Sequence, residues 1–155
     1  MRLRALALFV GAALVGGACS DNNNGVTIPS GLEIYTAQLN GANEAPTPVT
    51  TTATGHAVVT ILGNVVTWKV DIDTPIDSMT AGHIHRRASD SVAGNVQIPF
   101  AVVASGVGFT GNAATGSATP EDSILGIIRA GRSYVNIHTK AHAGGEIRGT
   151  LVRVQ

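Results

Sequence analysis

The sequence holds a single cysteine, Cys19, so no disulfide can form within the chain. Aromatic residues are also few, with three Phe, two Tyr and one Trp, while Val, Ile, Thr, Ala and Gly are abundant. This composition is typical of a β-rich domain whose core is built from small branched side chains. Basic residues form no cluster, which argues against a nucleic-acid partner. No Gly-rich phosphate loop joins a strand to a helix, so nucleotide binding has no support.

The first 18 residues have the charge and hydropathy pattern of a secretory signal peptide. Two arginines precede an apolar run from Ala5 to Val15, and small residues then lead to Cys19. The run is too short to span a bilayer as a helix. A cysteine after small residues resembles the lipobox of bacterial lipoproteins, although Gly16 stands where Leu is usual. We expect a periplasmic or cell-surface protein anchored to a membrane by a lipid on Cys19. Export with cleavage and no lipid is the alternative.

The rest of the chain divides into a tether and one domain. Residues 19–31 are rich in polar and turn-forming residues, which is typical of a flexible tether. Residues 32–155 are long enough for one domain with its own hydrophobic core.

Alternation of apolar and polar residues predicts a series of short strands in this domain. They fall near residues 35–40, 56–61, 66–72, 81–85, 96–102, 134–139 and 146–154. Gly63-Asn64 predicts a tight hairpin. Residues 73–78 are predicted as a loop, and the Gly-, Ala- and Thr-rich stretch 105–120 gives only weak strand signals. The apolar period changes between Pro120 and Gly131, which predicts one short helix. The pattern favours an all-β, antiparallel, Greek-key-like sandwich or flattened barrel with one short helix.

Three histidines fall on one predicted face of this sheet. In a strand, His83 and His85 point to one side and Ile84 to the other. His138 likewise shares a face with Tyr134 and Asn136. If the isoleucines face the core, three imidazoles gather on the outer surface. Such a cluster predicts either a copper or zinc site, with His142 or Asp90 as a fourth ligand, or a hydrogen-bonded polar cluster that holds the strands together.

Other polar residues are candidates for support around this cluster. Glu146 and Arg148 lie on the outer face two residues apart, and they are candidates for positioning an anion or orienting a histidine. An exposed pair that contributes little is the alternative. Asn136 is expected either to fix the tautomer of a neighbouring imidazole or to complete a hydrogen bond at the sheet edge.

Three stretches together resemble the CHRD domain, which takes its name from chordin and also occurs in bacterial exported proteins. They are residues 37–46 (AQLNGANEAP), the His83-Ile84-His85 strand, and Tyr134–Thr139 with the later GEIRG at 145–149. The resemblance implies an extracytoplasmic β-sandwich. It also favours a structural bond for Glu146 and Arg148, to Glu44 or a loop carbonyl.

A looser resemblance is to copper–zinc superoxide dismutase, which also has a His-x-His strand and a late histidine-bearing strand outside an antiparallel barrel. The resemblance implies His83, His85 and His138 as copper ligands. This chain lacks the disulfide cysteines of that family, and residues 86–94 carry no histidine for a bridging zinc. Dismutase activity is therefore a remote alternative.

Two functions from different classes follow. The first is a cell-envelope binding or structural module, which presents its loops to an envelope protein, a glycan or a small ligand. The second is a copper- or zinc-binding protein that uses the three histidines. No nucleophile or pair of carboxylates accompanies the site, so an enzyme is not the expectation.

Overall fold

The computed structural model describes residues 28–89 and 92–155. The predicted signal peptide, most of the predicted tether, Cys19 and Asp90 lie outside the described residues. The domain begins with a strand at Leu32, where the tether was expected to end.

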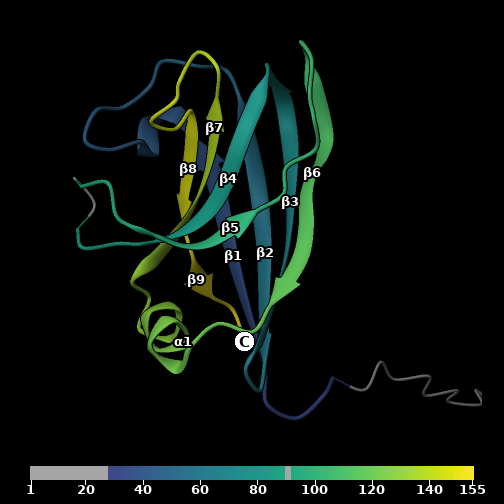
Figure 1. Cartoon of the computed structure of the whole chain (residues 1–155), viewed down its shortest axis with the longest axis vertical. Coiled ribbons are helices and arrows are strands. Elements are labelled where there is room, and N and C mark those ends of the chain that lie inside the picture. The colour runs from purple at the N-terminus through teal and green to yellow at the C-terminus, as the bar shows by residue number, and fades with distance from the viewer. Residues whose placement is uncertain (1–27, 90–91) are drawn as a thin grey trace, which may run out of the picture.

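One antiparallel sheet makes up most of the fold (Figure 1). Its strand order is β5-β4-β7-β8-β1-β2-β3-β6, and β9 pairs with β1. The elements are β1 (Leu32–Asn40), η1 (Gly41–Asn43), β2 (Thr54–Leu62), β3 (Val65–Ile76), β4 (Met79–Arg86), β5 (Val96–Phe100), β6 (Phe109–Ala118), α1 (Asp122–Arg129), β7 (Ser133–Thr139), β8 (Ile147–Thr150) and β9 (Val152–Arg153). The predicted all-β class with one short helix is confirmed.

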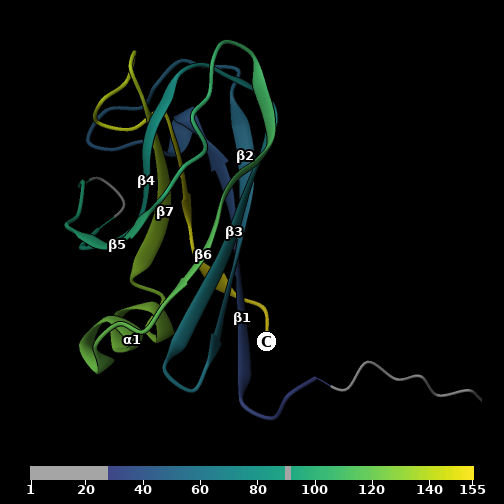
Figure 2. The same cartoon turned by 45° about the vertical axis from the view of Figure 1, so that its right-hand side comes forward.

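The sheet curls into a nearly closed barrel, as the two views in Figures 1 and 2 show. Its first and last strands, β5 and β6, approach each other through the segment after β5. There the Val103 amide donates to the Ala113 carbonyl at 2.8 Å, and the Ser78 amide donates to Gly106 at 2.8 Å. These bonds pair part of the polar backbone that an open sheet would expose at its edges.

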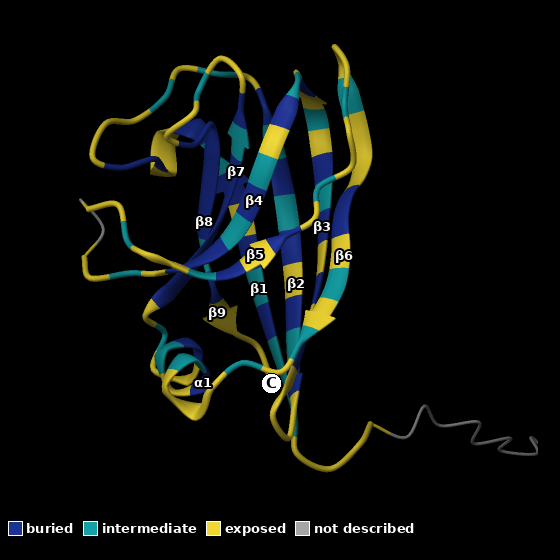
Figure 3. Ribbon diagram, viewed as in Figure 1, coloured by how far each residue is buried: buried dark blue, intermediate teal, exposed yellow. Residues whose placement is uncertain are grey.

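The interior is lined by the alternate apolar residues of each strand (Figure 3). Val59, Ile61 and Val66 are fully buried in the β2–β3 hairpin, whose turn at Gly63-Asn64 agrees with the sequence. Trp68 of β3 stacks on Phe100 of β5 with ring centroids 4.8 Å apart. This contact joins β3 to the end strand β5 across the core.

Helix α1 closes one end of the barrel, near the C-terminus (Figure 1). Leu125 and Ile128 belong to the core, and Gly131, with φ of +66°, follows the helix end as predicted. Within the described residues, no helix has the length and apolar character needed to cross a membrane.

Gly126 in the middle of α1 offers a site for stabilisation. A Cβ at this position meets no atom within 4 Å, and the residue is exposed. Because glycine loses the most backbone entropy in a helix, we expect Gly126→Ala to raise the free energy of unfolding by about 0.5–1 kcal/mol. Urea denaturation of both proteins measures the difference, and a loss of stability would contradict this account of α1.

Two sequence predictions are wrong, one at the end of β3 and one at β6. Residues 73–76 continue β3 instead of forming a loop, and Pro75 is accommodated where the pairing with β6 is irregular between Ile72 and Ile76. The stretch with weak strand signals contains the ten-residue strand β6. Packing between strands explains a small residue in β6. Gly116 lies opposite Trp68, and a Cβ on Gly116 would approach the indole Cζ2 to 2.6 Å.

Candidate metal centre

Strands β4 and β7 bring the three histidines together. Their antiparallel register pairs His83 with Asn136 and Ala81 with His138, so His138 lies diagonally across from His83. Ile84, Val135 and Ile137 point the other way and are fully buried. The alternation read from the sequence therefore places the imidazoles correctly on the outer face. They are more enclosed than an open surface, because His85 is only 7% exposed.

The ligating atoms of the three rings converge. Nδ1 of His83 lies 3.0 Å from Nε2 of His138. One potential ligand atom from each of the three histidines falls within 4.8 Å of the others. Metal–nitrogen bonds are about 2.0–2.1 Å long, so ligand nitrogens on one ion lie at most about 4 Å apart. The first pair meets this requirement, and the widest separation among the three exceeds it by less than 1 Å.

Two backbone carbonyls orient two of the rings. Nδ1–H of His85 donates to the Gly94 carbonyl at 2.8 Å, and Nδ1–H of His138 donates to Ala143 at 2.9 Å. A carbonyl only accepts, so each neutral ring carries its proton on Nδ1 and a lone pair on Nε2. Histidines that bind metals are commonly held in this way by a hydrogen bond from the second nitrogen.

The Nε2 lone pair of His85 has no partner in the part of the chain that the structure describes. Its Nε2 is buried and makes no hydrogen bond to any described residue. Burying such an atom costs free energy unless a partner is supplied. The single N–H of neutral His83 is directed at Nε2 of His138. It therefore cannot also donate to Nε2 of His85.

The site favours neutral imidazoles. Burial lowers the pKa of His83 to about 4, and the proximity of His138 and His85 adds to this effect. Burial also lowers the pKa of His85 and that of His138, against an opposing hydrogen bond to a carbonyl in each case. At neutral pH all three lone pairs are therefore free of added protons, which metal binding requires.

Tyr134 of β7 supports the cluster from one side. Its ring stacks on His85, with centroids 4.9 Å apart and planes 4° from parallel. Its hydroxyl accepts a hydrogen bond from the Gly94 amide at 2.9 Å, and the guanidinium of Arg148 lies 3.6 Å above its other face. Tyr134 shares the outer face with Asn136 and His138. The alternation in β7 therefore already indicated which way Tyr134 faces, although no role for it was predicted.

Glu146, Arg148, Asn136 and Glu44 are all buried. The carboxylate of Glu146 accepts hydrogen bonds from Thr51 at 2.8 Å and Thr139 at 2.7 Å, which ties the segment before β2 to the end of β7. The alternative of an exposed pair is therefore wrong. Arg148 donates to the Val92 carbonyl at 3.4 Å, which is a loop carbonyl of the kind expected.

Asn136 holds a loop and not an imidazole. Its Nδ2 donates to Oε1 of Glu44 at 2.6 Å, so neither role expected for Asn136 is correct. Burial raises the pKa of Glu44 to about 7, although Arg148 and these hydrogen bonds oppose the rise. His142 does not join the cluster of ligand atoms among the described residues, and it lines a separate recess with Glu44 and Gly145.

The fold and site together define a nearly closed antiparallel β-barrel with three buried or half-buried histidines on its outer face. The family model described as CHRD domain matches residues 35–151, and the chain belongs to this family. CHRD domains occur in extracellular and secreted proteins, where they suggest a binding or structural module. Searches of curated proteins and of solved structures found no match.

Proposed function

We propose that this CHRD domain is a metal-binding module of the cell envelope, which holds one copper or zinc ion through His83, His85 and His138. The observation that carries the proposal is the buried Nε2 of His85, which has no hydrogen-bond partner among the described residues and lies beside two other converging ring nitrogens. A metal ion would supply that partner. Imidazole is a suitable ligand for both zinc and copper.

Metal binding would require one proton to move. In the metal-free site, a proton lies between Nδ1 of His83 and Nε2 of His138, which are 3.0 Å apart. Moving that proton to Nε2 of His83 leaves three lone pairs for the ion. Three protein ligands leave a fourth coordination position for water or another ligand. This is compatible with a redox reaction, including the remote dismutase alternative.

Direct metal analysis tests this proposal. Untagged residues 28–155 are incubated with zinc or copper, and bound metal is measured after gel filtration. We expect one ion per chain, and less than a tenth of that for His83→Ala. His56→Ala is the matched control, because His56 lies on β2 beside Asp71 and Asp73 and outside the cluster. If neither ion binds at a one-to-one ratio, or if His83→Ala binds as well as the parent, the proposal fails.

We also propose that the module is exported and anchored to a membrane by a lipid on Cys19. The support is the order of basic, apolar and small residues before the cysteine, together with membership in a family found outside cells. Bound to the membrane, the domain would present its loops to envelope proteins or glycans.

Expression of the full chain in a bacterium with an alkyne fatty acid tests the anchor. We expect label on the protein and recovery in the membrane fraction. Cys19→Ser should lose the label and appear in the soluble exported fraction. An unlabelled parent found with the soluble protein would leave export without lipidation as the explanation.

A further inference from the structure

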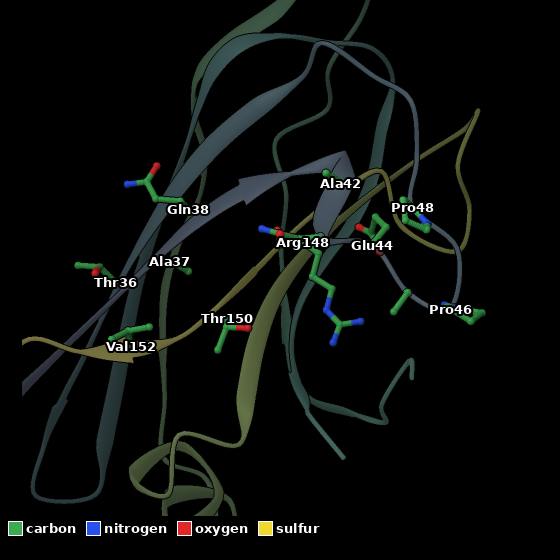
Figure 4. A pocket seen from close by; sticks show the side chains of 12 residues that line it. Thr36, Ala37, Gln38, Ala42, Glu44, Pro46, Pro48, Arg148, Thr150 and Val152 are labelled. Carbon is green, nitrogen blue, oxygen red and sulfur yellow. The ribbon is translucent and has the colours of Figure 1, made fainter. Parts of the chain in front are cut away.

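A second site lies apart from the histidines, on the outer face of the sheet. A pocket of about 680 Å³ opens where β1, β8 and β9 meet the segment 42–48 (Figure 4). Its volume is within the range of pockets that bind small molecules. None of the three clustered histidines lines it. The pocket therefore needs an explanation of its own.

Arg148 forms part of the pocket wall and has unused hydrogen-bonding capacity. The residue is 3% exposed, yet within the described residues no carboxylate lies within ion-pair distance of its guanidinium. Nη1 makes one long hydrogen bond of 3.4 Å to Val92, and Nε and Nη2 make none to the described residues. These two nitrogens form the edge with which arginine binds a carboxylate through two parallel bonds.

The position of this guanidinium is fixed before any ligand arrives. Its Cζ atom lies 3.6 Å from the centroid of the Tyr134 ring, which is itself stacked on His85. Cation–π contact with a buried ring holds the group without using its N–H donors. A positive charge in a preorganised position is worth more for binding an anion than one on a mobile side chain.

Glu44 lines the same pocket and limits the charge of the ligand. It does not form an ion pair with Arg148, and its Oε1 is occupied by the Asn136 amide at 2.6 Å. A carboxyl group beside a single arginine disfavours an anion with two charges, because the second charge would be uncompensated. A ligand with one negative charge fits this arrangement better.

The rest of the wall combines hydrogen-bonding groups with small apolar ones. Thr36, Gln38 and Thr150 offer hydroxyl and amide groups, while Pro46 and Val152 offer apolar surfaces. We propose that the pocket binds a small hydroxylated monocarboxylic acid, of the sugar-acid type, with its carboxylate on Arg148 and its hydroxyls on the threonines and Gln38. Such an acid can be free or at the end of a glycan.

Amide NMR titration with D-glucuronate tests the proposal, with D-glucose and inorganic sulfate as comparison probes. We expect saturable shifts at Gln38, Arg148 and Thr150 with glucuronate, none with glucose, and at least tenfold weaker binding of sulfate. Absence of saturable shifts with glucuronate overturns the proposal. Equal binding of glucose or of sulfate also overturns it, because the carboxylate or the hydroxyls would then not be recognised.

Two variants locate the binding. Arg148→Lys keeps the charge but loses the paired donors, and we expect binding to weaken at least tenfold. Thr150→Val keeps the shape of a half-exposed side chain, so it covers the case in which Arg148→Lys does not fold, and we expect a several-fold loss. Unchanged affinity in Thr150→Val contradicts the placement of the ligand. Repeating the titration with metal-free His83→Ala separates this site from the metal site, because the proposal requires glucuronate binding to persist there.

Discussion

Saturating zinc or copper is expected to raise the melting temperature of the domain by on the order of 10 °C. An ion that binds only the folded state at a thousand times its dissociation constant adds about 4 kcal/mol of stability. In a domain of this size each kilocalorie shifts the midpoint by a few degrees. The structure provides a specific reason for a large effect, because the ion would satisfy the buried Nε2 of His85. Differential scanning calorimetry with and without metal measures the shift.

Single substitutions in the same experiment identify which histidines bind the metal. His83→Ala, His85→Ala and His138→Ala should each lose most of the metal-induced shift. His142→Ala should keep it, because His142 lies outside the group of converging nitrogens in the described residues. A large loss in His142→Ala would restore this residue as the fourth ligand. A shift that survives in all three cluster variants would contradict the site.

Metal binding is also expected to persist in mildly acidic solution. A lowered pKa means that an imidazole stays neutral to lower pH than usual, and the pKa of His83 is about 4. Protons should therefore compete for His83 only as the pH approaches 4, and because the pKa values of His85 and His138 are also lowered, the loss of affinity should be centred below pH 6.5. Isothermal titration at several pH values checks this. A loss of affinity centred near pH 6.5, as for exposed histidines, would contradict the burial of the site.

A large loss of stability is expected from adding a single methyl group at Gly145 or Gly149. A Cβ on Gly149 would lie 2.3 Å from the Gln38 carbonyl oxygen, which is backbone of the neighbouring strand. A Cβ on Gly145 would lie 2.5 Å from the Asn136 amide and 2.8 Å from Glu44, and φ there is +127°. We expect Gly149→Ala and Gly145→Ala each to cost at least about 3 kcal/mol, because strain adds to the loss of buried hydrogen bonds.

Gly144 is the matched control for this prediction. It precedes Gly145 directly, but a Cβ on it meets nothing within 4 Å and its φ is not positive. Gly144→Ala should therefore change the free energy of unfolding by less than about 0.5 kcal/mol. Chemical denaturation of the three variants decides. Similar stabilities for Gly144→Ala and Gly145→Ala would show that the close packing of Asn136 and Glu44 against this turn is not important.

The packing around Gly145 and Gly149 explains part of the family resemblance in physical terms. Residues 37–46 and 145–149 are far apart in the sequence, yet Asn40 pairs with Arg148 in the sheet. The Asn43 side chain donates to the Arg148 carbonyl at 3.1 Å, and Glu44 receives the Asn136 amide. Residues from two of the stretches that carry the resemblance, Asn136 included, thus form a partly buried polar network that holds the loop after β1 against β7 and β8.

The local elements were predictable where packing and sequence period agree. The β2–β3 hairpin and α1 follow directly from alternation, a turn at Gly63-Asn64 and a change of apolar period. The prediction failed at β6 and at the end of β3. At β6 the residue type depends on the neighbouring strand. Trp68 of β3 leaves room only for a glycine at position 116, so β6 lacks the β-branched pattern that is usual in a strand.

The sequence alone determined which side chains share a face, because alternation in a strand is a local property of the backbone. It therefore placed His83, His85 and His138 outside the core and the isoleucines inside it. Only the tertiary structure decided that β4 and β7 are neighbours, that two loop carbonyls orient the rings, and that Arg148 and Glu146 are buried. These features depend on distances between segments far apart in the chain, and no local pattern encodes such distances.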